Sequence, residues 1–275
     1  LACSVLIAGL VFEIVEAAHR KRLRELEDQS TKKAMTLATR TLFSSFYDEK
    51  VIDKVYKSIF GSPFVRSNFE VSYILTEYEE LRGILNCVIQ YEWEVKNVGL
   101  VPSPYPVSAF LSNPFASWDE HSEKLCGRIL SLKIDGKPLT AAQLTKFNAG
   151  IDCNTDTQTI RIKDVIIRPG KSLTVIAKFN FAKLVSDGEI FRHNIASSGS
   201  TVTIINQTNH VLPMNIAPIG PVNFDPPKEV PGHRHGQRWE SKDVFLPHNG
   251  WVVYWNDIEA LRTLNTAMAK DKHKA

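Results

Sequence analysis

The chain has 275 residues, of which 43% are hydrophobic and 23% charged, and its formal net charge is +3. This composition is ordinary for a globular protein with a packed core, and the small net charge excludes a protein dominated by a dense basic surface for double-stranded nucleic acid. The four cysteines, Cys3, Cys87, Cys126 and Cys153, form no Cys-x-x-Cys pair, so we expect free thiols in a reducing compartment, with disulfides as the alternative.

The N-terminal residues 1–12, LACSVLIAGLVF, are apolar and uncharged. A bilayer needs about 20 such residues, so we expect the run to continue before Leu1 and residues 1–18 to be the end of a transmembrane or membrane-inserted segment. A signal peptide is disfavoured because the basic residues follow the apolar run instead of preceding it. A buried helix of a soluble bundle is the other alternative.

Charged residues close to this segment predict its orientation. Glu13 and Glu16 are three residues apart and share one helix face, either at the headgroup level or, in an oligomer, at the mouth of a polar pore. A basic cluster follows, which we expect to contact lipid headgroups and to keep the bulk of the chain on the cytoplasmic side of a bacterial inner membrane. Its members are Arg20, Lys21, Arg22 and Arg24.

Residues 19–66 read as a helical stalk or linker. Ala34, Leu37, Ala38 and Leu42 fall on one helical stripe. Gly61-Ser62-Pro63 ends a second helix, which places a boundary near residues 61–67.

Residues 67–275 are predicted to form a β-rich cytoplasmic domain. Apolar residues alternate with polar ones from Phe69 to Leu75 and from Leu85 to Val95, as in strands with one buried face. The Pro-rich stretch that follows, 100–115, is predicted to be a loop. Further strands are expected at 128–134, 159–167, 173–181, 201–206, 238–246 and 251–255.

Turn signals between these strands predict hairpins. Asp135-Gly136, residues 168–171 and residues 247–250 each lie between two predicted strands. A short helix is expected at 257–270. The predicted fold class is therefore α+β: N-terminal membrane and stalk helices, a mainly antiparallel β-sandwich or barrel, and a short C-terminal helix.

Motifs for catalysis are missing from the sequence. Gly170-Lys171-Ser172 lacks the upstream glycine of a phosphate-binding loop. His233 and His235 could meet one metal ion in an extended strand, but a solvated loop between Pro231 and Gly236 is the better interpretation. We therefore expect no catalytic residue, no metal and no cofactor, although a site could still converge in the fold.

Aromatic residues near the C-terminus give the one hint of ligand binding. Trp239, Trp251 and Trp255 are interpreted first as core residues; with Arg234 or Arg238 they could instead form a purine-stacking pocket.

The order of segments, an apolar N-terminus, a basic stalk and a β-rich domain, resembles the membrane effectors of bacterial anti-phage systems. The resemblance implies a homo-oligomer, or a complex with another protein, that senses a ligand such as a small nucleotide and disrupts the lipid membrane. A constitutive membrane-tethered module that binds another protein by strand addition and a membrane-tethered hydrolase with a hidden site are the alternatives.

Overall fold

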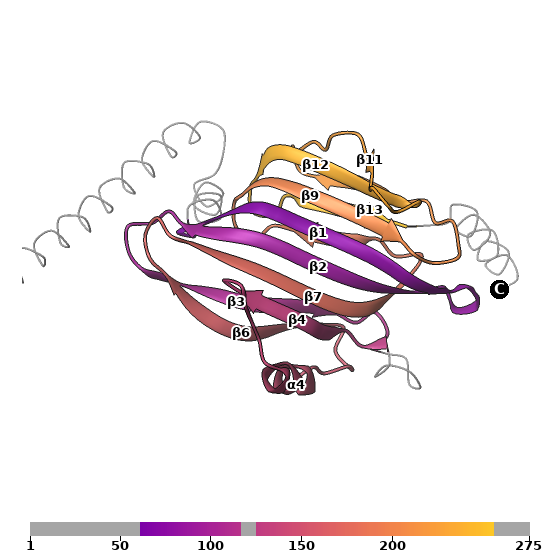
Figure 1. Ribbon diagram of the computed structural model, residues 1–275, viewed down its shortest axis with the longest axis horizontal. Helices are drawn as coiled ribbons and strands as arrows, with labels where there is room; N and C mark the ends of the chain where they lie inside the picture. The colour runs from indigo at the N-terminus through magenta and orange to yellow at the C-terminus, as the bar shows by residue number, and fades with distance from the viewer. Residues whose placement is uncertain (1–60, 117–124, 256–275) are drawn as a thin grey trace, which may run out of the picture.

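The alternation of apolar and polar residues builds the centre of one large sheet. The computed structural model describes residues 61–116 and 125–255 (Figure 1). The sequence alternates along β1 (Phe64–Glu79) and β2 (Ile84–Asn97), which form an antiparallel pair. Gly83, with φ of 63°, makes the tight turn that leads into β2, because glycine has no Cβ to oppose that conformation.

Three sheets contain all the strands of the described residues. The large sheet has the strand order β11-β12-β9-β1-β2-β7-β4-β5, in which only β1 and β9 run parallel. The smaller sheets are β10-β13-β8 and β3-β6. The remaining bounds are β3 (Ser103–Ser112), β4 (Arg128–Ile134), β5 (Lys137–Pro138), β6 (Thr157–Ile167), β7 (Ser172–Leu184), β8 (Glu189–Arg192), β9 (Ser197–Asn206), β10 (Asn215–Ile219), β11 (Lys228–Glu229), β12 (Gly236–Phe245) and β13 (Gly250–Tyr254), with the 3-10 helix η1 (Glu80–Arg82) and the α-helix α4 (Ala141–Ala149).

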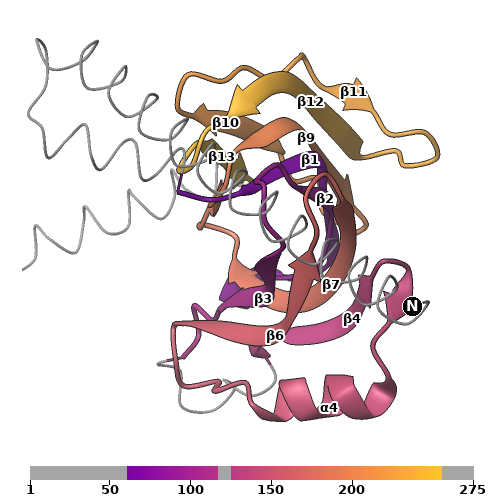
Figure 2. The same cartoon turned by 90° about the vertical axis from the view of Figure 1, so that its left-hand side faces the viewer.

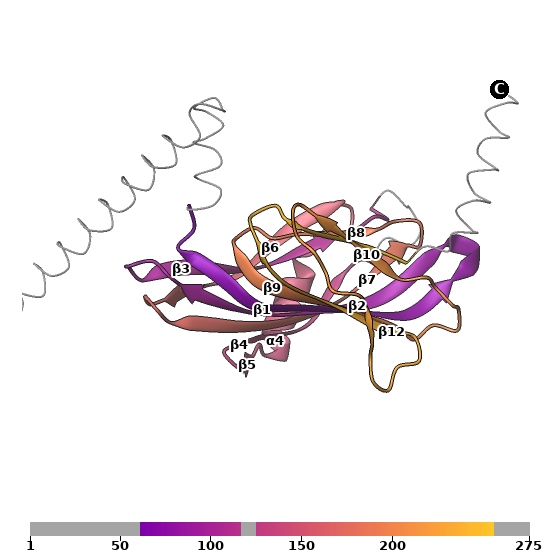
Figure 3. The same cartoon turned by 90° about the horizontal axis from the view of Figure 1, so that it is seen from above.

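The two small sheets cover one face of the large one. Figure 2 shows the large sheet curving from β12 to β4, with both small sheets on its concave side, and Figure 3 shows the layers from above. Each small sheet encloses its own hydrophobic core. The first core lies beneath β3-β6 and includes Val95, Val107, Leu111, Ile129, Leu132, Leu173 and Val175. The second core lies beneath β8-β13-β10 and includes Phe69, Tyr73, Leu75, Val202, Trp239, Phe245, Trp251 and Trp255.

The predicted fold class needs correction. Among the described residues no helix has the length and apolar character needed to cross a bilayer, and α4 is the one α-helix in that part of the chain. This finding contradicts a fold built on N-terminal membrane helices, and with it the predicted location in the bacterial inner membrane. The predicted segment 1–18, the stalk up to residue 60 and the helix at 257–270 lie outside the described residues, as do Glu13, Glu16 and the basic cluster 20–24.

Several strands were predicted within a few residues of their bounds, but β3 was missed. Residues 103–112 form a strand although they contain Pro104 and Pro106. The loop prediction was wrong because β3 is an edge strand, where a missing N–H leaves no ladder bond unmade.

Two predicted hairpins are also wrong. The turn at 168–171 connects β6 to β7, but β6 pairs with β3 whereas β7 pairs with β2 and β4. Likewise β12 and β13 belong to different sheets. In both places the chain crosses between layers, and a local turn signal cannot distinguish a crossing from a hairpin. The hairpin at Asp135-Gly136 is confirmed by the pairing of β4 with β5.

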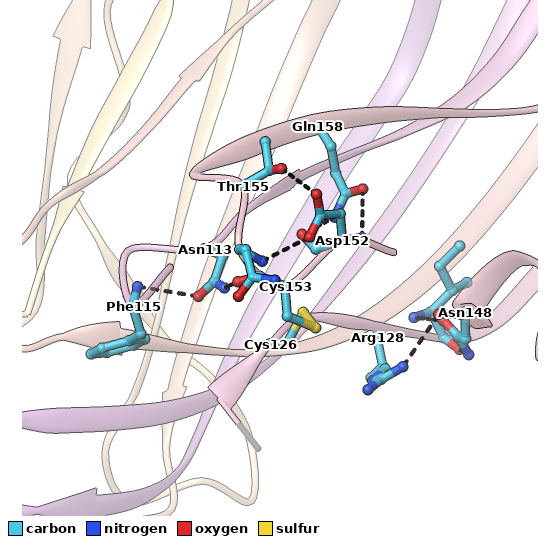
Figure 4. Close-up of a disulfide and its surroundings, with 11 residues drawn as sticks. Asn113, Phe115, Cys126, Arg128, Asn148, Asp152, Cys153, Thr155 and Gln158 are labelled. Carbon is cyan, nitrogen blue, oxygen red and sulfur yellow. Dashed lines mark hydrogen bonds between the residues drawn. A yellow bond between two sulfur atoms is a disulfide. The ribbon is translucent and has the colours of Figure 1, made fainter. Parts of the chain in front are cut away.

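A disulfide fixes the segment around α4. Cys126, just before β4, bonds to Cys153 in the loop between α4 and β6 (Figure 4). Asn113 at the end of β3 donates its side-chain N–H to the carbonyl of Cys153. The expectation of free thiols is therefore wrong for Cys126 and Cys153. Disulfides are typical of oxidising compartments. Cys87 is a buried free cysteine.

Candidate anion-binding site

Arg66 lies on β1 between the two cores, since Phe64 belongs to the first core and Phe69 to the second. The register of β1 against β2 shifts between Ser67 and Glu70, and Asn68 takes a positive φ of 50°, which asparagine tolerates better than most residues. Such a bulge re-aims the neighbouring side chains. The Arg66 side chain is buried, with 6% of the residue exposed.

The guanidinium of Arg66 contacts only neutral groups in the described chain. Nη2 donates to Oδ1 of Asn194 at 3.1 Å, and Nη1 lies 3.5 Å from Nδ1 of His193. Its central carbon is 5.0 Å from the Phe69 ring centroid and 5.6 Å from that of Trp93. No carboxylate in the described residues pairs with it, although a buried charge is costly unless it is paired.

Two buried donors at this place have no acceptor among residues 61–116 and 125–255. They are Nε of Arg66 and Nε1 of Trp93. Asn194 is exposed and Trp93 is half-buried. The group that would satisfy these donors is therefore a hydrogen-bond acceptor that carries negative charge.

The neighbouring His193 is held in its neutral form. Burial and then the positive charge of Arg66 lower the pKa of His193 to about 3. Because arginine can only donate, Nδ1 of His193 accepts; Nε2–H then donates to Oγ of Ser200, 3.3 Å away, and Ser200 donates to the carbonyl of Gly199 at 2.7 Å.

Ser200 and His193 are not arranged for nucleophilic catalysis. A serine nucleophile needs a histidine base that can take its proton, held by a third group that stabilises the charged imidazole. Here a guanidinium occupies the place of the third group, and the serine hydroxyl is bonded away from the imidazole. The arrangement can bind an anion but cannot activate Ser200.

A second buried cation, Lys183, differs from Arg66 because it has its counterion. Its Nζ lies 2.7 Å from the carboxylate of Glu189, and the side chains are 8% and 16% exposed. Burial, and then the carboxylate of Glu189, raise the pKa of Tyr91 and of the Cys87 thiol. Both groups therefore stay protonated, and no negative charge from them reaches Arg66.

Of the residues predicted to bind a ligand, the three tryptophans share one core, whereas the two arginines do not lie in it. Trp239, Trp251 and Trp255 are at most 3% exposed and pack in the second core, which agrees with the core interpretation. Arg238 lies 2.9 Å from the carboxylate of Glu240 on the uncovered face of the large sheet, and Arg234 is exposed in the turn before β12.

His233 and His235 are the remaining sequence candidates, as a possible metal pair. In the described part of the chain no three His, Cys, Asp or Glu side chains are placed to hold a metal ion. Sequence reasoning missed Arg66 and His193, because neither belongs to a motif. Arg66 also fell at the end of the predicted linker 19–66, although it lies on β1.

The known proteins similar to this chain are distant solved structures. No family model matches the chain and no curated protein matches it. The M1 zinc metallopeptidase from Deinococcus radiodurans matches with 12% identity over 73% of this chain and 45% of that chain, at a TM-score of 0.35. A putative protease from Parabacteroides distasonis matches with 10% identity over 71% and 41%, at a TM-score of 0.36. The chain thus spans less than half the length of either structure.

The predicted membrane-effector function is corrected by these findings. The described residues contain no helix long and apolar enough to cross a bilayer. Neither likeness is close enough to transfer an activity.

Proposed function

We propose that the domain is a non-catalytic binding module that recognises a small oxyanion, a phosphate or carboxylate group, at Arg66. The observation that carries the proposal is Arg66, a residue that is 6% exposed and whose guanidinium has no carboxylate partner in the described chain. Arginine offers its donors in a planar fork that fits two oxygens of either anion. The buried N–H of Trp93, beside the guanidinium, would supply a further donor.

The neutrality of His193 supports the same proposal. A protonated His193 would repel Arg66, and burial together with the charge of Arg66 lowers the pKa of His193 to about 3. An anion bound at Arg66 would relieve this repulsion. The pKa of His193 should therefore rise when the ligand binds.

The test is ligand titration of the full-length protein with inorganic phosphate, adenosine monophosphate and acetate as probes. Binding should raise the melting temperature and change the tryptophan fluorescence, because Trp93 adjoins the guanidinium. The phosphate and acetate arms distinguish the two kinds of oxyanion. A response to chloride of the same size at equal ionic strength would count against a specific site.

Variants separate binding from folding. Arg66→Met should keep or raise the melting temperature without ligand, since a buried unpaired charge is replaced by a hydrophobic side chain, and should lose the ligand-induced rise. Arg66→Lys should weaken binding by about tenfold because it loses the fork. Arg192→Met, at an exposed arginine beside His193, is the matched control and should bind normally. An unchanged response in Arg66→Met would refute the site.

A further inference from the structure

The two strands of the β3-β6 sheet each have one unpaired edge, and these edges differ. The register places Pro104 opposite Ile166 and Pro106 opposite Asp164. Because proline has no N–H to give to a partner, these are positions whose backbone groups point away from β6. The outer edge of β3 therefore lacks two donors, which blocks the addition of another strand.

The outer edge of β6 has no partner strand in the described part of the chain. By the same register, Asp164 and Ile166 direct their backbone N–H and C=O groups away from β3. Both residues are exposed, Ile166 by 62%. Within the described residues, no backbone hydrogen bond from a loop or neighbouring strand reaches either of them.

The other terminal strands in the described sheets are short or interrupted. β5 and β11 have two residues each, β8 has four, and β10 has five with Pro218 among them. Short edges are a common protection against unwanted strand pairing. β6, with eleven residues and no proline, stands apart from this pattern.

The charge of this edge indicates what would pair with it. Lys163, Arg168 and Lys171 are exposed and form no ion pair in the described chain. The one carboxylate in β6, that of Asp164, is already bound by Arg161, whose Nε lies 2.9 Å from Oδ1. A second copy of β6 would bring like charges together across the new pair, which is unfavourable.

Exposed apolar side chains adjoin the end of β6. Val98, Leu100 and Val101 are between 44% and 56% exposed. The side chain of Asn97 holds this loop beside the strand, because its Nδ2 donates to the carbonyls of Val101 and Ile167 at 2.8 Å. A partner with aliphatic as well as acidic residues would fit this surface.

We propose that the free edge of β6 receives an extended, acidic segment of a partner protein as an added strand. Main-chain hydrogen bonds to Asp164 and Ile166 would supply affinity, and the three uncompensated cations would select the charge. This surface is separate from the site at Arg66, so either proposal can fail without the other.

The probe is a fluorescein-labelled peptide of eight residues that alternates Glu and Val, added to the full-length protein and followed by fluorescence anisotropy. It should bind, and the binding should weaken with salt. A Lys-Val peptide and a peptide methylated at alternate amide nitrogens should bind at least tenfold more weakly. Absence of Glu-Val binding at millimolar peptide would overturn the proposal.

Variants locate the binding on β6. Ile166→Pro removes an outward donor while keeping the ladder to β3, and should weaken binding at least tenfold. Lys163→Glu/Arg168→Glu should do the same, whereas Lys133→Glu/Lys137→Glu on β4 and β5, at exposed lysines, is the matched control. Equal binding by Ile166→Pro would refute the edge as the site. Self-association in sedimentation that Ile166→Pro abolishes would replace the acidic partner with a second copy.

Discussion

The first core, beneath β3-β6, and the second core, beneath β8-β13-β10, cover the same face of one sheet but contain different side chains. The first is largely aliphatic and lies next to the Cys126–Cys153 disulfide. The second is largely aromatic: the Phe191 and Trp251 rings stack at 4.6 Å, and the ion pair of Lys183 and Glu189 lies nearby. Arg66 lies where the two meet.

This contrast separates what holds the domain together from what it can recognise. Aliphatic packing and a covalent link stabilise a fold but select no ligand. Burying a charge or an aromatic N–H group without a partner costs free energy. Each such group in a folded protein therefore needs an explanation other than packing, such as ligand binding. The second core and its border with the first are accordingly the place to look for a buried ligand site.

The largest effect should come from Lys183→Met in the second core. Removing one partner of a buried ion pair leaves an uncompensated charge on Glu189, at a cost of about 3–5 kcal/mol in the free energy of unfolding. Urea denaturation measures this loss. Lys183→Met/Glu189→Leu should recover most of it, and Lys178→Met, on the other face of β7, should change little. A loss below about 1 kcal/mol for Lys183→Met would mean that water solvates the carboxylate of Glu189, and that the second core is more accessible to water than its burial indicates.

A slightly smaller effect should come from the first core. Cys126 and Cys153 are 27 residues apart, and a loop of this size corresponds to roughly 3.6 kcal/mol of chain entropy in the unfolded state. Cys126→Ser/Cys153→Ser should lower the free energy of unfolding by about that amount, and dithiothreitol should lower the stability of the wild type but leave the variant unchanged. If the variant loses the tertiary circular dichroism of the tryptophans in the second core as well, the two cores unfold as one unit.

The sequence predicts individual strands better than it predicts which strands pair in one sheet. The alternation from Phe69 to Leu75 and from Leu85 to Val95 correctly predicted β1 and β2. A strand with one buried face shows alternating apolar and polar residues within its own sequence. The assignment of strands to sheets could not be predicted, because the turn at 168–171 looks the same whether β7 returns to β6 or crosses to β2.

One local signal was present but not used. Thr140 and Gln143 form a capping box that starts α4, and the pattern T-x-x-Q is visible in the sequence. The site at Arg66 had no such signal, because its partners His193 and Asn194 are more than 120 residues away along the chain.

The smallest expected effect, taken per pH unit, is a pH dependence from His193. In the folded protein its pKa is lowered from 6.5 to about 3, chiefly by burial and then by Arg66. The unfolded chain therefore takes up a proton below pH 6.5 that the folded protein takes up only near pH 3. Stability should fall as the pH drops through this window, by at most about 1.4 kcal/mol per pH unit from this residue. Urea denaturation between pH 4 and pH 7 should show a smaller slope for His193→Gln, while His233→Gln, at an exposed histidine, should retain the slope of the wild type. An identical slope in His193→Gln would show that His193 is protonated in the folded protein. In that case the proposed anion site would hold two positive charges, those of Arg66 and His193.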